Sequence, residues 1–150
     1  MAKNSSLGVA APRPAIYLLK SVQDALRAEL DKALAPLALT PPQMAVLSAL
    51  SSRPQLSNAE LARAVFVKPQ SMVPVLQLLE SRGWIARRRA STGRTMPTEL
   101  TPEGRDRLKA SRVATNEIEA HMLASLSSKD KLRLRELLEH CLESLRPNQG

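Results

Sequence analysis

The chain contains almost no aromatic residues, and this scarcity limits the kind of core it can build. Its three aromatic side chains are Tyr17, Phe66 and Trp84, which make up 2% of the sequence, whereas hydrophobic residues as a whole make up 43%. The core must therefore consist mainly of Leu, Val, Ala and Met. Because β-strands are enriched in aromatic and β-branched residues, this composition favours helices over a β-sandwich.

The length and the cysteine content narrow the class of protein further. A chain of 150 residues fits one compact domain or two small lobes that share a core. Cys141 is the only cysteine, so no disulfide can form within the chain and a reducing environment is indicated. The first eleven residues contain no apolar run as long as that of a signal peptide, and no segment approaches the ~18 apolar residues of a membrane span. We therefore expect a cytoplasmic protein without a membrane partner.

Apolar residues recur at helical spacing through most of the sequence. The first such stretch covers residues 14–35. Two capping boxes follow, at residues 40–43 and 57–60, and each predicts the start of another helix. Pro69 suits the first position of a fourth helix, which should end near Arg82.

The end of this fourth helix and the segment that follows it have a different pattern. Gly83 can adopt the left-handed conformation that ends a helix, and Pro74, inside the helix, removes a backbone donor, so we expect a local distortion there. Residues 84–89 predict a strand, residues 90–94 a turn, and residues 95–100 a returning edge strand that contains a proline. The sequence therefore predicts a β-hairpin.

Most of the excess of positive over negative charge in the chain lies in and around this hairpin. The formal net charge is +8, and residues 82–112 alone carry nine basic and three acidic side chains. Such a segment suits the phosphates of a nucleic acid. The arginines of the hairpin that we expect to contact DNA are Arg87, Arg88, Arg89 and Arg94.

Two further helices complete the chain. One should start at Thr101 and could reach Leu126, and a third cap at Ser127 starts the last helix. The last helix has a wide apolar face with no later segment to cover it, so a partner helix is expected to do so. This face includes Leu134, Leu138, Cys141 and Leu145.

The order of these elements predicts a mainly α protein with a small α+β wing. Two short helices joined by a tight turn and followed by a basic hairpin describe a winged helix-turn-helix. The second helix of the pair fits a major groove ~12 Å wide while the first braces it, and the hairpin reaches phosphates or the minor groove. We therefore expect a protein that binds double-stranded DNA.

The sequence resembles the multiple-antibiotic-resistance-regulator (MarR) family over roughly residues 14–146. The most specific part of the resemblance pairs a Leu-Glu-x-x-Gly helix end with a Leu-Thr-x-x-Gly exit from the wing. The stretches that carry it are 61–63, 68–72, 79–85, Arg94 and 100–104.

The resemblance implies a domain organisation and a mode of action. Residues 1–13 would form a flexible tail, residues 37–100 the DNA-binding domain, and residues 14–36 and 101–146 a helical dimerisation lobe. The expected protein is a homodimeric transcriptional repressor that binds a pseudo-palindromic operator and is relieved by a small aromatic or phenolic effector. The residues that would bind this effector are not predicted.

The resemblance also assigns roles to individual positions. Ser57 and Asn58 would meet phosphate, and Arg94 would enter the minor groove from the tip of the wing. The groove-facing residues of the recognition helix would be Lys68, Gln70, Ser71, Val73, Pro74 and Gln77.

Two positions depart from the family pattern. Thr92 stands where an acidic residue usually orients the wing arginine, and Pro74 stands where a polar or basic residue is usual. From Pro69 to Ser81 there is no Lys or Arg, so the common arginine–guanine contact cannot be made there. Gln70 suits adenine and Val73 a thymine methyl group. We expect weaker base discrimination, with affinity drawn mainly from the wing.

Other readings of the sequence lead to different predictions. The uncharged recognition helix also fits a winged-helix protein-interaction module with weak or nonspecific DNA binding. An enzyme is not expected, because no phosphate-binding loop, zinc-hydrolase motif or nucleophile elbow occurs. Cys141 is expected to be a small buried hydrophobe. His121 and His140 are too poorly placed for a metal site, so no metal and no cofactor is predicted.

Overall fold

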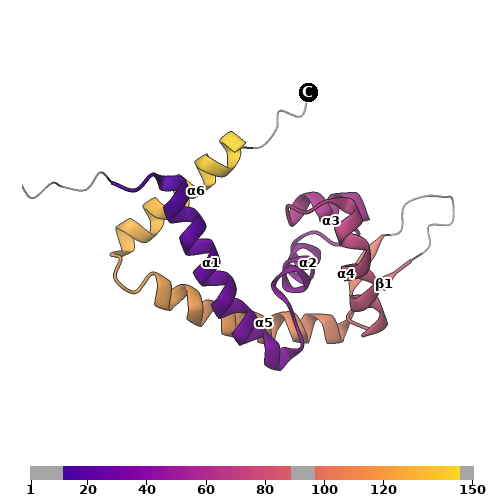
Figure 1. The fold of residues 1–150 in the computed structure, drawn as a ribbon. Coiled ribbons are helices and arrows are strands. Elements are labelled where there is room, and N and C mark those ends of the chain that lie inside the picture. Colours follow the sequence, from indigo (N-terminus) through magenta and orange to yellow (C-terminus); the bar gives the residue numbers. More distant parts are fainter. Residues whose placement is uncertain (1–11, 89–96, 146–150) are drawn as a thin grey trace, which may run out of the picture.

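The long helix α5 joins the two halves of the molecule. The computed structural model describes residues 12–88 and 97–145. In Figure 1, α5 extends under the bundle formed by α2, α3 and α4 at its N-terminal end, while α1 crosses it and α6 lies beyond its C-terminal end. In chain order the elements are α1 (Ala15–Leu34), the 3₁₀ turn η1 (Ala35–Leu37), α2 (Pro41–Ser52), α3 (Asn58–Ala64), α4 (Pro69–Ser81), β1 (Ile85–Arg87), β2 (Thr98–Leu100), α5 (Pro102–Met122) and α6 (Ser128–Leu145).

The core is aliphatic, as the composition predicts, and it lies in the half of the molecule that holds α2, α3 and α4. Leu34 at the end of α1 and Leu108 of α5 belong to it, so both long helices are anchored there. Trp84 is the one aromatic side chain in this cluster among the described residues. The other buried members are Leu39, Val46, Leu47, Leu50, Leu56, Leu61, Ala62, Met72, Leu76, Leu79 and Ile85.

The capping boxes expected from the sequence are present. The backbone N–H of Thr40 donates to Oε1 of Gln43 at 3.1 Å, and the backbone N–H of Ser57 donates to Oε2 of Glu60 at 2.8 Å. At the start of α6, the backbone N–H of Asp130 donates to the hydroxyl of Ser127 at 3.1 Å. These bonds satisfy backbone donors that have no partner within the helix, so each helix starts where its cap stands.

Helix α4 continues through Pro74 from Pro69 to Ser81. The distortion expected at Pro74 does not break the helix, although a proline leaves the carbonyl of residue i−4, here Gln70, without its usual helical donor. Gly83 ends the helix with φ +70°, as predicted. The N–H of Gly83 donates to the carbonyl of Glu80 at 2.9 Å, which satisfies one of the last carbonyls of α4.

The hairpin is antiparallel, and within the described residues its paired part is shorter than the predicted strands. Ile85 pairs with Leu100, Ala86 with Glu99 and Arg87 with Thr98. The second strand begins directly after Pro97, which has no N–H for the ladder, but the carbonyl of Pro97 accepts from the N–H of Arg88 at 3.1 Å. The predicted turn at residues 90–94 lies outside the described residues.

The first turn of α5 rests directly on the connection between α4 and β1. The backbone N–H of Thr101 donates to the carbonyl of Trp84 at 3.2 Å, and its hydroxyl donates to the carbonyl of Gly83 at 2.6 Å. A Cβ placed on Gly104 would stand 1.9 Å from that same Trp84 oxygen. The absence of a side chain at residue 104 therefore lets α5 touch the backbone of the wing.

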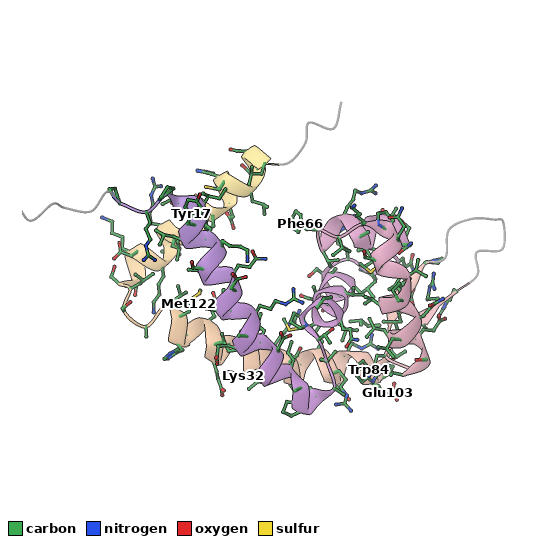
Figure 2. All side chains as sticks on the ribbon, in the orientation of Figure 1. Tyr17, Lys32, Phe66, Trp84, Glu103 and Met122 are labelled. Carbon is green, nitrogen blue, oxygen red and sulfur yellow. The ribbon has the colours of Figure 1, made fainter. Side chains whose placement is uncertain are left out.

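The guanidinium groups of two arginines pack against the indole ring of Trp84. The guanidinium of Arg82 lies 4.9 Å and that of Arg107 5.1 Å from the centre of the indole ring, within the range of cation–π attraction. Arg82 also donates to the carbonyl of Ala38 at 2.5 Å, and Arg107 to the carbonyl of Leu37 at 3.2 Å. We call Arg82, Trp84 and Arg107 the tryptophan clamp; it ties the end of η1 to α4, β1 and α5. Figure 2 labels Trp84 near the base of the molecule, beside Glu103 at the start of α5.

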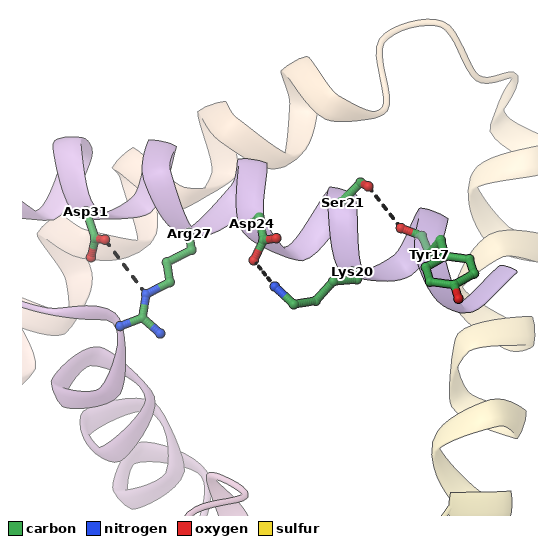
Figure 3. Close-up of polar contacts among 6 residues, drawn as sticks. All are labelled: Tyr17, Lys20, Ser21, Asp24, Arg27 and Asp31. Atoms are coloured by element: carbon green, nitrogen blue, oxygen red, sulfur yellow. Dashed lines mark hydrogen bonds and ion pairs between the residues drawn. The ribbon is translucent and has the colours of Figure 1, made fainter. Parts of the chain in front are cut away.

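The helices at the other end of α5 expose much of their apolar surface. In α1, ion pairs of Lys20 with Asp24 and of Arg27 with Asp31 follow one side of the helix (Figure 3). Other positions of its N-terminal half are apolar and exposed: Ile16, Tyr17, Leu18, Leu19 and Val22. Helix α6 has no buried residue at all. Its exposed apolar side chains are Leu132, Leu137, Leu138, Leu142 and Leu145.

No single helix in the described part of the chain is long and apolar enough to cross a membrane. The two consecutive segments Ala15–Leu37 and Pro41–Ser52 are together long and apolar enough for a span, but a bend of 77° separates them.

Candidate nucleic-acid interface

Helices α3 and α4 form a helix-turn-helix with a tight connection. Residues 65–68 link them, and Phe66 adopts the left-handed conformation with φ +57°. The N–H of Val67 donates to the carbonyl of Ala62 at 2.9 Å, which satisfies one of the last carbonyls of α3. Leu61 of α3 and Met72 of α4 are both buried in the core. The pair of helices is therefore held by backbone hydrogen bonds in the turn and by side-chain packing.

Helix α4 has two opposite faces. Met72, Leu76 and Leu79 are buried against the rest of the lobe. Residues at i, i+3, i+4 and i+7 share one side of a helix, and four exposed residues of α4 have this spacing on the side away from the core. We call them the α4 stripe: Gln70, Val73, Pro74 and Gln77. The helix is thus oriented to present two amides and an apolar surface to solvent.

The basic residues of the first wing strand have different environments. Arg87 has a side chain only 19% exposed, and its Nη1 lies 3.8 Å from Oε2 of Glu80 at the end of α4. Arg88, one residue on, is exposed. Arg87 thus compensates the negative charge of Glu80, the acidic side chain nearest the α4 stripe, while Arg88 is accessible to a phosphate. Arg89, Thr92 and Arg94 lie outside the described residues.

The remaining predicted contacts lie around the ends of α3 and α4. Ser57 is the cap of α3, and its hydroxyl oxygen accepts from the N–H of Glu60 at 3.3 Å. Asn58 is half-buried, and its Oδ1 has no hydrogen-bond partner among the described residues. Lys68 and Ser71 are exposed on either side of Pro69. The structure therefore places these side chains at the helix starts, with the Ser57 hydroxyl already engaged in capping.

The tryptophan clamp was not predicted from the sequence. Both of its arginines lie in the basic segment, but each donates to a backbone carbonyl of residues 37–38 rather than facing away from the protein. The adjacency of Arg82 and Trp84 around a helix-ending glycine is the one signal in the sequence, and it does not indicate Arg107. Part of the charge assigned to DNA binding therefore serves to join structural elements.

Cys141, His121 and His140 are the remaining residues of the sequence with metal-binding or redox chemistry that were weighed above. Cys141 was expected to be buried, but it is exposed in the single chain, because none of the described elements packs over this side of α6. No group of three or more His, Cys, Asp or Glu side chains that could hold a metal occurs within residues 12–88 and 97–145.

The capping box of α3 should make the stability of the fold depend on pH. The backbone N–H of Ser57, and then its hydroxyl, lower the pKa of Glu60 below its ordinary value of 4.5. Because this pKa is lower in the folded state than in the unfolded state, the ionised carboxylate of Glu60 stabilises the fold at pH values above the ordinary pKa. This stabilisation is lost as the pH falls through the folded-state pKa. Glu60→Gln keeps a carbonyl oxygen for the Ser57 N–H but cannot ionise. We expect the wild type to melt at a higher temperature near neutral pH and the two melting curves to converge in acid.

Thermal unfolding of both proteins between about pH 6 and pH 3 measures this effect. Glu29, whose pKa is also lowered, by its hydrogen bond to Lys32, is present in both proteins and cancels in the comparison. A difference in melting temperature that stays constant across this range would contradict the assignment.

Comparison with known proteins agrees with this geometry. The MarR family model matches residues 39–93, which include α2, α3, α4 and β1. The HTH-type transcriptional repressor Rv2887 of Mycobacterium tuberculosis strain H37Rv is 40% identical to the chain over 134 residues, 89% of this chain and 96% of that protein. The chain belongs to the MarR family. The resemblance found in the sequence is thereby confirmed.

Solved structures agree with the MarR assignment over both halves of the molecule. The crystal structure of the M. tuberculosis MarR family protein Rv2887 in complex with DNA matches with a TM-score of 0.73 and 38% identity, over 87% of this chain and 98% of that chain. The structure of Rv2887 with salicylic acid matches with a TM-score of 0.71 and 40% identity, over 89% and 99%. The predicted winged helix-turn-helix is confirmed, and the chain is a DNA-binding transcriptional regulator rather than an enzyme.

Proposed function

We propose that this MarR-family chain is a repressor that binds a pseudo-palindromic operator as a homodimer and releases it when a small aromatic acid binds. The observation that carries the proposal is the 40% identity to Rv2887 across 89% of the chain. This likeness covers the helices at both ends as well as the winged helix, and Rv2887 is a repressor solved with DNA and with salicylic acid.

The DNA contacts in this proposal come from three places. The α4 stripe enters the major groove together with Ser71, and Lys68 meets a phosphate at its edge. Ser57 and Asn58 face phosphate at the start of α3. The wing arginines supply the remaining contacts: Arg88, Arg89 and Arg94 directly, and Arg87 through its pairing with Glu80.

The dimer in this proposal is built from the helices outside the DNA-binding domain. Residues 14–36 and 101–146 form the dimerisation lobe, residues 37–100 the DNA-binding domain, and residues 1–13 a tail. The exposed apolar side chains of α1 and α6 support this division, because a single chain leaves them in water. Between α5 and α6 lies an open groove of about 230 Å³ lined mainly by apolar residues, including Met122, Leu134 and Leu138. A twofold dimer places two copies of α4 about 34 Å apart, one turn of DNA.

An effector acts in this proposal by changing the distance between the two α4 helices. Such an effector must bind one spacing of the helices more tightly than the other, because equal affinity for both would shift nothing. Salicylic acid, a phenolic acid bound by Rv2887, defines the chemical class to test first. The protein acts on DNA in the cytoplasm.

The proposal is tested by an electrophoretic mobility shift with the duplex upstream of the protein's own gene. We expect Arg94→Ala to weaken binding and to reduce the slope of log K against log salt by about two, because each protomer of the dimer loses one contact that displaces counterions. Lys129→Ala, which removes an exposed positive charge at the start of α6 far from the wing, is the matched control and should leave the slope unchanged.

Two further observations decide the proposal. Salicylic acid added to the complex should release the duplex, and it should fail to do so if the effector belongs to another class. Equal affinity for all duplexes, with no preference for a palindrome, would contradict operator binding and support the protein-interaction module.

A further inference from the structure

We propose that the α4 stripe reads A·T base pairs, and that its selectivity depends on the C5 methyl groups of thymine. This inference rests on the proposed function, since it requires α4 to lie in a major groove. It goes further by naming the base pairs that the chain selects and the side chains that select them.

The chemistry of the α4 stripe matches the major-groove edge of an A·T pair. Gln70 and Gln77 stand two helical turns apart, at i and i+7, and each amide can donate to N7 and accept from N6 of adenine. Between them lie Val73, whose side chain is 42% exposed, and the ring of Pro74. An apolar surface of this kind makes favourable contact with a thymine methyl group, which lies beside the adenine donors and acceptors in the same groove.

The same helix lacks the groups that read guanine. Recognition of O6 and N7 of guanine commonly requires the guanidinium of Arg or the ammonium of Lys, and no ionisable side chain occurs from Pro69 to Leu79. Lys68 is the N-cap of α4, with extended backbone angles, so it precedes the helical turns that carry the α4 stripe, and it is exposed there. Its position beside the helix start suits a phosphate and not a base edge.

The acidic residue nearest the stripe does not read cytosine either. A carboxylate would accept from N4 of cytosine, but Glu80 is paired with Arg87 at 3.8 Å. Ser81, the next polar side chain on this side, donates its hydroxyl hydrogen to the carbonyl of Leu78 at 2.8 Å. The α4 stripe therefore offers two amides and one apolar patch, a set complementary to adenine with thymine, while the neighbouring hydroxyl of Ser71 does not discriminate between bases.

Selection of duplexes from a randomised pool by the purified full chain tests the base preference. We expect a palindrome with A·T pairs at two symmetric segments about one helical turn apart, where the two α4 helices lie. A palindrome with G·C pairs at these segments would overturn this inference and leave the proposed function intact. Failure to enrich any palindrome would overturn the proposed function and this inference with it.

Deoxyuridine substitution in the selected duplex tests the dependence on methyl groups. Replacing thymine by deoxyuridine at the α4-facing pairs removes only the C5 methyl groups, and we expect affinity to fall several-fold. The same replacement in the flanking sequence should have no effect. Val73→Ala should bind the thymine duplex more weakly and lose most of its sensitivity to the replacement. Equal affinity of the wild type for both duplexes would overturn the methyl contact.

A change of specificity tests the role of the first amide. Gln70→Arg places a guanidinium on the α4 stripe, so we expect the preferred pair at one symmetric position to change from A·T to G·C, with a ratio of affinities on the order of tenfold. The ratio between two duplexes is compared within the variant, because the added charge strengthens binding to both. An unchanged preference for A·T at every position would show that Gln70 does not contact a base.

Discussion

Replacing Gly104 by Ala is expected to destabilise the protein by about 3 kcal/mol or more. In the interior of a helix this change normally stabilises by up to about 1 kcal/mol. Here the new Cβ would stand 1.9 Å from the carbonyl oxygen and 2.9 Å from the carbonyl carbon of Trp84. These are backbone atoms, and the oxygen accepts from the N–H of Thr101, the N-cap of α5, so the contact can be relieved only if α5 moves away from the wing.

Chemical denaturation at a fixed protomer concentration measures this change. Ala110→Gly, at an exposed position of the same helix, is the matched control and should cost no more than about 1 kcal/mol. Equal or higher stability of the Gly104→Ala protein would show that α5 does not rest on Trp84. If the Gly104→Ala protein folds but binds DNA weakly, the substitution has changed the orientation of the wing.

Replacing Leu138 and Leu142 together by Glu is expected to yield a monomer that binds the operator at least about 100-fold more weakly. Both side chains are exposed in the single chain, at 42% and 40%, so their replacement should not unfold the protomer. Two charges on each facing surface would oppose association, since an unpaired charge is costly to bury. A lone winged helix then loses the contribution of its tethered partner, which acts at millimolar effective concentration.

Light scattering and circular dichroism separate the two possible failures of this variant. Helical content should be retained while the mass falls to that of one chain. Exchanging the ion pair Arg133 and Glu136, as Arg133→Glu with Glu136→Arg, alters the opposite side of α6 and should leave the mass unchanged. If the double-glutamate variant remains dimeric, this side of α6 does not belong to the dimer interface.

The parts of the fold that follow from local chemistry could be predicted from the sequence. The capping boxes at Thr40 and Ser57 fixed the starts of α2 and α3, because a cap satisfies backbone donors within three residues of itself. Pro69 and Gly83 bounded α4 for the same local reason. Pro74 lies inside α4, as predicted, and the helix continues through it.

The features that could not be predicted depend on contacts between distant residues. The pairing of Arg87 with Glu80 was not predicted, because it is decided by how β1 packs on α4. Arg107 reaches the carbonyl of Leu37 across seventy residues of sequence. The burial of Cys141 depends on a surface that one chain does not cover, so the apolar spacing of α6 predicted its face but not its exposure in the protomer.

Trp84 has a further use because the chain contains only one tryptophan. All indole fluorescence of the protein arises where Arg82 and Arg107 approach a single ring, between η1 and the first turn of α5. Nearby cations alter the emission of an indole, so a change in the distance of either guanidinium alters the emitted light. The unlabelled protein therefore carries an optical probe at the point where its two halves meet.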